Sequence, residues 1–406
     1  DTTSAGWTLQ AALQRAGDAS LDVLQARQNL SAAQADVKTA AVTPAPVLSL
    51  NSQAIDPNRF GGGSLWHRQM DTIVRLDKTL ERGNKAALRE RSAQAGADAA
   101  RQDLLDTVRA RRVAAAQAYW DLKLAQEQDA ISARNSELAQ ASARTARLRL
   151  QQGDLSRLEA TRLAVEAERA ANEQAQSRVQ LVSARQALRQ VLALDGTTAA
   201  TLQAADAWPA EAEAQRAKLS DPAGGDERWL EARADVQAAV QRVAQAQALV
   251  DLAEAQRRAD VTVGVQFEHY PAVGNHLWGV GVSIPLGVDG RQAGPVARAL
   301  ATLETARLQL DQLRAGLRTE RAVLLATLQA AQARVQRLDT VLLPQAREAL
   351  QSAEFARQQG ALPLQDVLDA RRSLHAAELD AATAHADLAK ALAALTLTSE
   401  PDTVTP

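Results

Sequence analysis

The sequence of 406 residues contains no cysteine, so disulfides, cysteine nucleophiles and thiolate metal sites are excluded. Aromatic residues make up only 3% of it, which is fewer large side chains than a compact globular core usually needs. The formal net charge is −2, so no strong attraction to nucleic acid is indicated. No apolar run approaches the roughly 18 residues that a membrane-crossing helix requires. What remains is dominated by Ala, Gln, Arg, Glu and Leu, a composition typical of long, closely packed helices.

Glycine and proline, which break helices, are missing from long stretches of the chain. Gly153 is the only glycine between Gly96 and Gly196, and Gly360 is the only glycine after Gly316. An isolated glycine in the middle of a helix-forming stretch favours a bend. We therefore predict that each of the two isolated glycines lies at the turn of a long helical hairpin.

The two glycines lie in similar sequence segments, "QQGDLSRLEATR" at 151–162 and "QQGALPLQDVLD" at 358–369. In the first, Ser156 and Glu159 form an S-x-x-E pattern, which predicts a capping box at the start of the returning helix. In the second, Pro363 takes the place of the serine, and proline is favoured in the first turn of a helix. The chain is thus predicted to make the same turn twice.

The duplication extends beyond the turns, because both halves read as helix, strand, strand, long helix, turn and helix. The predicted organisation is a first repeat at 1–205, a linker at 206–225, a second repeat at 226–398 and a tail at 399–406. The outgoing helices are predicted at about 81–150 and 292–357. At 1.5 Å per residue, each is about 100 Å long. Pro344 is predicted to kink the second one.

Four segments alternate between apolar and polar residues, as β-strands do. They lie at about 46–55, 66–79, 261–270 and 277–286. In one of them Val261, Val263, Val265 and Phe267 share a face. Strands of about 10 residues in hairpins are typical of transmembrane β-barrels, although a small soluble sheet with one face on a core fits the pattern equally well. Four strands cannot close a barrel, which needs at least about 8, so membrane-spanning strands would require several chains to share one barrel.

Several motifs in this order resemble the TolC-type outer-membrane factor family, the exit ducts of Gram-negative tripartite efflux systems. The motifs are "ARQNLSAAQADVKTAAVTPAPVLSL", "LERGNKAALRE", "RADVQAAVQRVAQAQ", "SIPLGVDGRQAG" and the two turn segments at 151–162 and 358–369. The resemblance covers essentially the whole chain in two tandem copies. The stretch "TLERGNKAALRE" further resembles the branch that serves heavy-metal efflux pumps for cobalt, zinc, cadmium and nickel.

The resemblance implies a mainly α fold with a small β part. Three identical chains would form a trimeric α-barrel of long helical hairpins and share one 12-stranded outer-membrane β-barrel, with four strands from each protomer. The linker and the C-terminal segment would form an equatorial belt. The implied function is passive conduction of substrate, with heavy-metal cations as the expected cargo, from an inner-membrane RND pump and a periplasmic adaptor across the outer membrane. The implied location is the outer membrane of a Gram-negative bacterium, in contact with its lipid and with a long periplasmic part.

The family closes its duct near the hairpin turns, and its constriction motif matches Asp366 and Asp369. Three residues apart, they share one helix face and would form stacked acidic rings in a trimer, which attract cations. The alternative is a solvated acidic face near a helix start, where acids favour the helix dipole. Well-described family latches carry an aromatic and a basic residue around the second turn glycine, where this chain has Arg357 and Leu362. We hypothesise that Arg357 supplies the cation that faces Glu159 in a tip latch, or that no such latch exists.

The resemblance also assigns adaptor docking to the two turns. The turn residues are Gln152, Gly153, Asp154, Leu155, Ser156, Gln359, Gly360, Ala361, Leu362 and Pro363. Two other classes remain as alternatives: a periplasmic adaptor of the same pumps, which normally has a single hairpin, and a soluble coiled-coil scaffold. The sequence shows no nucleophile–base pair, phosphate loop or metal-ligand cluster, so neither an enzyme nor a cofactor is predicted. His269 and His276 flank a predicted hairpin and could face each other.

Overall fold

The computed structural model describes residues 6–53, 55, 70–194, 202–210, 227–270 and 275–399. Contacts within the chain divide it into two compact units. The first unit comprises Asp1–Arg27, Leu104–Ala234 and Arg314–Pro406, and the second comprises Gln28–Asp103 and Asp235–Leu313. Each unit therefore contains segments of both predicted repeats.

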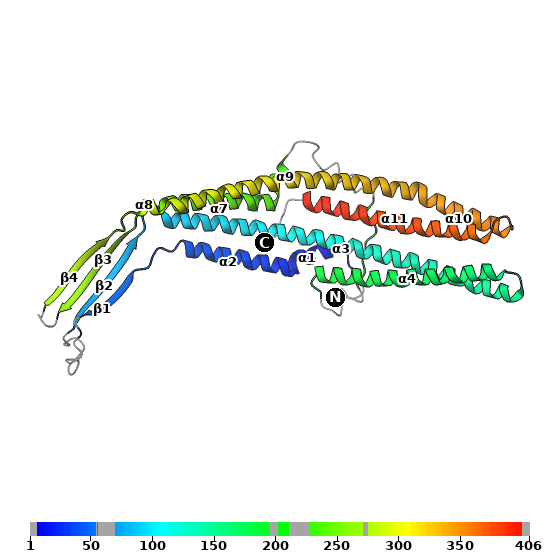
Figure 1. The fold of residues 1–406 in the computed structure, drawn as a ribbon, viewed down its shortest axis with the longest axis horizontal. Coiled ribbons are helices and arrows are strands. Elements are labelled where there is room, and N and C mark those ends of the chain that lie inside the picture. The colour runs from blue at the N-terminus through cyan, green and yellow to red at the C-terminus, as the bar shows by residue number, and fades with distance from the viewer. Residues whose placement is uncertain are drawn as a thin grey trace. The chain divides into compact units, whose positions relative to one another are not determined.

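The second unit contains a four-stranded sheet and the helices that lead into and out of it (Figure 1). Its elements are α2 (Leu21–Ala40), β1 (Val47–Gln53), β2 (Asp71–Leu80), the start of α3 (Lys85–Gln152), α7 (Ala234–Ala255), β3 (Val261–Tyr270), β4 (Asn275–Ser283), α8 (Val288–Arg291) and the start of α9 (Ala293–Arg337). Apart from the short α8, both halves of the chain follow the predicted order of helix, strand, strand and long helix.

The strands lie close to their predicted ranges. β3 occupies the predicted residues 261–270, and β1 falls within the predicted 46–55. β2 covers most of the predicted strand at 66–79, whose first four residues lie outside the described residues. The correction concerns β4, which ends at Ser283 rather than at 286. The next residues include Pro285, which has no N–H to donate to a strand ladder.

The register of the sheet gives its two faces opposite characters. Neighbouring strands are antiparallel, in the order β1-β2-β3-β4. One face carries two apolar rows, Leu50–Val74–Phe267–Trp278 and Leu48–Leu76–Val265–Val280, and the other carries the row Ser49–Arg75–Gln266–Gly279. The apolar face is exposed in the single chain, since Trp278 is 76% and Val280 79% exposed. A soluble sheet packs its apolar face on a core, so this exposure does not fit the soluble-sheet alternative.

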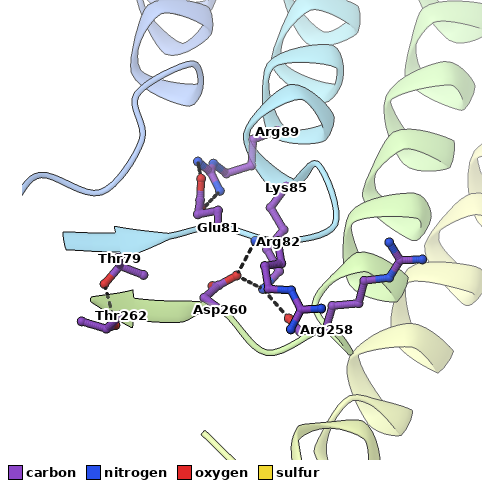
Figure 2. A network of polar contacts seen from close by, with 8 residues as sticks. All are labelled: Thr79, Glu81, Arg82, Lys85, Arg89, Arg258, Asp260 and Thr262. Carbon is purple, nitrogen blue, oxygen red and sulfur yellow. Dashed lines mark hydrogen bonds and ion pairs between the residues drawn. The ribbon is translucent and has the colours of Figure 1, made fainter. Parts of the chain in front are cut away.

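A network of ion pairs joins the sheet to α3, as Figure 2 shows. Arg89 donates to both carboxylate oxygens of Glu81, at 2.6 and 2.9 Å. The ammonium of Lys85 and the backbone N–H of Arg82 both donate to Asp260, at 2.7 and 2.9 Å. The Lys85 side chain is only 9% exposed, and a buried cation needs such a partner. The motif "LERGNKAALRE" thus anchors the end of β2 and the start of α3 to the segment that leads into β3.

The first unit contains the two helical hairpins. Its elements are α1 (Leu9–Ala19), the remainder of α3, α4 (Arg157–Val191), α6 (Arg228–Ala232), the remainder of α9, the π-helical segment η4 (Leu338–Leu342), α10 (Leu343–Gln358) and α11 (Leu364–Ser399). Figure 1 shows α4 returning beside α3, and α11 returning beside α10. Among the helices described, none is both long enough and apolar enough to cross a membrane.

The long helices are as predicted, with one irregularity. The helix predicted at 81–150 is α3, which begins four residues later, at Lys85, and runs for 68 residues to Gln152. The helix predicted at 292–357 is α9 followed by α10, and η4 stands between them and ends two residues before Pro344. A π-helical turn is one of the ways in which a helix absorbs a residue that cannot donate its backbone N–H. The irregularity predicted at Pro344 is therefore a π-helical turn.

The core of the first unit is built around a buried tyrosine and many alanines. The hydroxyl of the fully buried Tyr119 accepts a hydrogen bond from the backbone N–H of Asp206 at 3.0 Å. Burial raises the pKa of Tyr119, so the hydroxyl stays protonated. Trp7 forms a parallel bridge with Ala204 beside it. Residues 202–210, where the predicted linker begins, therefore pack on the helices, and the rest of that linker lies outside the described residues.

Candidate functional site at the hairpin turns

Both helical hairpins reverse direction through the same backbone motif. Gly153 has a φ of +83° and Gly360 a φ of +75°, in the left-handed region that glycine enters without steric cost. In both turns the residue after the glycine donates its N–H to the carbonyl five residues earlier, at 2.9 Å. This bond defines a Schellman motif, which satisfies the last carbonyls of the outgoing helix. The predicted pair of equivalent turns is thus confirmed.

The returning helices begin as the sequence indicates, with small differences. Ser156 is the N-cap of α4, and its hydroxyl oxygen accepts from the backbone N–H of Glu159 at 3.2 Å. The serine hydroxyl also lies 3.1 Å from the Glu159 carboxylate, to which it donates, so the reciprocal bond of a full capping box is replaced by a side-chain contact. Pro363 directly precedes α11, one residue before the first helical position.

The ten residues of the two turns form mostly exposed surface. Only Leu155 and Leu362 are half-buried, and the others are exposed. In order, these residues are Gln152, Gly153, Asp154, Leu155, Ser156, Gln359, Gly360, Ala361, Leu362 and Pro363. Apart from the glycine itself and its two chain neighbours, nothing lies within 4 Å of the place where a side chain would begin on Gly153 or Gly360. The turns are therefore shaped by backbone conformation and not by packing.

An ion pair connects the two hairpins next to the turns. The guanidinium of Arg357, in the last turn of α10, donates to the carboxylate of Glu159 on α4 at 2.9 Å. It also donates to the carbonyl of Leu362 at 3.3 Å. The hydrogen bond from Arg357, followed by the one from Ser156, lowers the pKa of Glu159 below its usual value of 4.5. The two residues hypothesised as a latch are thus in contact within one chain.

Asp366 and Asp369 lie in the first two turns of α11. Both are exposed, whereas Val367 and Leu368 between them are buried. The Asp369 carboxylate accepts from the amide of Gln365 at 3.1 Å. The two aspartates therefore lie on the outward side of the helix, where they are available to solvent or to a neighbouring chain.

Sequence reasoning missed a set of contacts between α11 and the helices beside it. Arg371 donates to Glu354 of α10 at 2.8 Å, and Arg372 donates to Glu166 of α4 at 2.9 Å. Arg372 follows Asp369 by three residues, which could have indicated a pair on one helix face. Glu166 lies 206 residues away in the sequence, and no local pattern points to it.

The two histidines that flank the β3–β4 hairpin do face each other. The Nδ1 atoms of His269 and His276 lie 3.0 Å apart, which is a hydrogen-bond distance. Within the described residues, no three or more His, Asp and Glu side chains are grouped to hold a metal ion. The pair is therefore a cross-strand contact of the sheet.

Comparison with solved structures shows which proteins share this fold. The outer membrane protein VceC of Vibrio cholerae matches with a TM-score of 0.78 at 19% identity, with 96% of each chain covered. The outer membrane channel CmeC of Campylobacter jejuni matches with a TM-score of 0.82 at 15% identity, over 96% of this chain and 85% of that chain. The chain has the fold of these outer-membrane channel proteins.

Sequence comparison finds similarity to a known family and to one of its functional relatives. Residues 227–398 match the family described as outer membrane efflux protein. The cobalt-zinc-cadmium resistance protein CzcC of Cupriavidus metallidurans is 26% identical over 378 residues, which cover 92% of this chain and 85% of that protein. The family resemblance predicted from the sequence is thus confirmed. The match to the family covers the second repeat, and the similarity to CzcC covers most of the chain.

Proposed function

We propose that three copies of this chain form the outer-membrane exit duct of a tripartite efflux system. An inner-membrane RND pump and a periplasmic adaptor deliver the substrate, which then diffuses passively through the duct. The support is the family match at 227–398 together with the fold shared with outer-membrane channels. The matched family is one of efflux channels and not of enzymes.

The observation that carries this proposal is the exposed apolar face of the four-stranded sheet. Lipid is the solvent in which such a face is stable, and the opposite face, with the ion pair of Arg75 and Asp77, suits a water-filled lumen. An open four-stranded sheet leaves unpaired backbone groups at its edges, which lipid does not tolerate. Three chains with four strands each close a barrel of twelve strands, so the trimer satisfies both requirements.

The two alternative classes fit this observation less well. A soluble coiled-coil scaffold has no need of an apolar face on a sheet. A periplasmic adaptor normally has one helical hairpin, whereas this chain has two with equivalent turns. The exit duct is therefore the reading that accounts for both the hairpins and the sheet.

The assembly state tests the proposal directly. Purified from membranes in detergent, the chain is expected to migrate in a denaturing gel as a trimer before heating and as a monomer after heating. The reason is that a closed β-barrel resists unfolding by detergent until it is heated, because its strands have no free edges. A stable monomer that stays in aqueous buffer without detergent would rule out the shared barrel.

Heavy-metal cations are the proposed substrate class. The support is the similarity to CzcC, a protein whose name describes resistance to cobalt, zinc and cadmium. The exposed carboxylates of Asp366 and Asp369 also suit a path for cations, because acidic rings attract cations and repel anions. In the trimer the two aspartates form the constriction of the duct.

The turns are proposed as the docking surface for the adaptor. This assignment is supported by the exposure of most of the ten turn residues and by the matching Schellman geometry of both hairpins. Two tips with the same backbone geometry in each chain give six such tips in a trimer. An adaptor ring could therefore contact every tip through the same backbone shape.

The contact between Arg357 and Glu159 is proposed as the latch that keeps the tips closed. Charge reversal in Arg357→Glu places two carboxylates together, so the conductance of the closed channel is expected to rise. In the wild type the latch should persist from pH 7 to about pH 4.5, because the pKa of Glu159 is lowered by Arg357. Its contribution is lost as the pH falls through that lowered pKa, so leak should appear only below pH 4.5.

Single-channel recordings in planar bilayers measure this leak. The control is the swapped pair Arg357→Glu with Glu159→Arg, which restores opposite charges and should restore the closed state. If Arg357→Glu leaves closed-state conductance unchanged, the latch is absent and the ion pair serves only to hold α4 beside α10.

A further inference from the structure

A second ionic contact connects the hairpins, two turns of helix away from the first. The guanidinium of Arg372 on α11 binds Glu166 on α4 in a forked arrangement, with Nε at 2.9 Å and Nη2 at 2.5 Å from the two carboxylate oxygens. The remaining nitrogen, Nη1, donates to Asp369 at 3.2 Å. The Arg372 guanidinium thus contacts both Glu166 on α4 and Asp369, one of the two aspartates of the proposed constriction.

The two contacts of Arg372 differ in strength and surroundings. The contact with Glu166 has two bonds in the planar fork that arginine and carboxylate prefer, whereas the contact with Asp369 has a single longer bond. Glu166 is 19% exposed and Asp369 is 55% exposed. The pair lies in a cleft of about 620 Å³ that α3, α4 and α11 line. Glu166 therefore holds the guanidinium more firmly than Asp369 does.

We propose that Arg372 sets the charge of the constriction and that Glu166 is the residue that keeps Arg372 from neutralising Asp369. This inference rests on the proposed function, because it gives the aspartates their place in the duct. With Glu166 in place, Asp369 keeps most of its negative charge toward the lumen. Without Glu166, the guanidinium of Arg372 pairs with Asp369 instead. The net negative charge of the ring formed by Asp369 then becomes smaller.

The proposal predicts opposite effects from removing the two partners. Glu166→Gln should lower the preference of the open channel for cations, because Arg372 then pairs fully with Asp369. Arg372→Gln should raise this preference, because Asp369 then has no cation beside it. We expect the permeability ratio of K⁺ to Cl⁻ to change by about threefold in each direction, the size of effect that a partly exposed ion pair produces.

The measurement is the reversal potential of the purified trimer in a planar bilayer under a KCl gradient. The decisive variant is the double change Glu166→Gln with Arg372→Gln, read as a mutant cycle. If Glu166 acts only by holding Arg372, then adding Glu166→Gln to Arg372→Gln changes nothing further. If Glu166 acts through space as one more negative charge near the lumen, then Glu166→Gln lowers the ratio equally in the wild-type and Arg372→Gln backgrounds, which would overturn the proposal.

A matched control lies on the same helix. Glu173 is seven residues after Glu166 on α4 and contacts His375 instead of an arginine, so Glu173→Gln makes the same charge change without releasing Arg372. It should leave the permeability ratio unchanged. A wild-type chain that forms no channel contradicts the proposed function itself. If the wild-type chain forms a channel and the Arg372→Gln and Glu166→Gln variants have the same selectivity as the wild type, only this inference is contradicted.

Discussion

Replacing Asp366 and Asp369 together by asparagine is expected to abolish the cation preference of the duct. Each trimer then loses two negative charges from each of three chains, six in all, at the proposed constriction. Both carboxylates are exposed, so their field reaches an ion in the lumen with little protein between them. We expect the permeability ratio of K⁺ to Cl⁻ to fall by about tenfold, which corresponds to about 1.4 kcal/mol.

Reversal potentials in planar bilayers give this ratio, and the same recordings with zinc chloride test the proposed substrate class. The control is Asp380→Asn with Asp387→Asn, which removes two charges from the same helix further from the turn. This control should keep the wild-type ratio. If the Asp366 and Asp369 variant also keeps it, the two residues are a solvated acidic helix start, which is the alternative that the sequence left open.

Placing valine at both turn glycines, Gly153→Val with Gly360→Val, is expected to weaken docking of the adaptor by at least about tenfold. A β-branched residue in the left-handed region costs about 1–2 kcal/mol, because its Cβ approaches the neighbouring carbonyl. The space around both glycines is open, so the cost comes from backbone conformation alone. The turns should therefore change shape while the helices behind them stay folded.

The affinity of the detergent-solubilised trimer for its adaptor, measured by surface binding, tests this expectation. Gly316→Val is the matched control, because Gly316 is an exposed glycine inside α9 with open space around it and ordinary helical backbone. It should dock as the wild type does. Wild-type affinity in the double turn variant, with the heat-sensitive trimer intact, would remove the turns from the docking surface.

The sequence by itself determined the elements and most of their ends. Isolated glycines at 153 and 360 marked the turns because only glycine enters the left-handed conformation without cost, and this is a property of one residue and its neighbours. Alternation of apolar and polar residues placed β3 correctly for the same local reason. The end of β4 was predicted too late, because the apolar alternation continued through Pro285, which cannot donate to a ladder.

Only the tertiary structure decided which distant side chains meet. Sequence patterns did not reveal that β2 of one repeat pairs with β3 of the other, or that Arg372 is divided between Glu166 and Asp369. The contact of Arg357 with Glu159, 198 residues apart, was reached only through the family resemblance. The physical reason is that periodicity and turn chemistry act over a few residues, whereas a contact between helices depends on how their surfaces pack against each other.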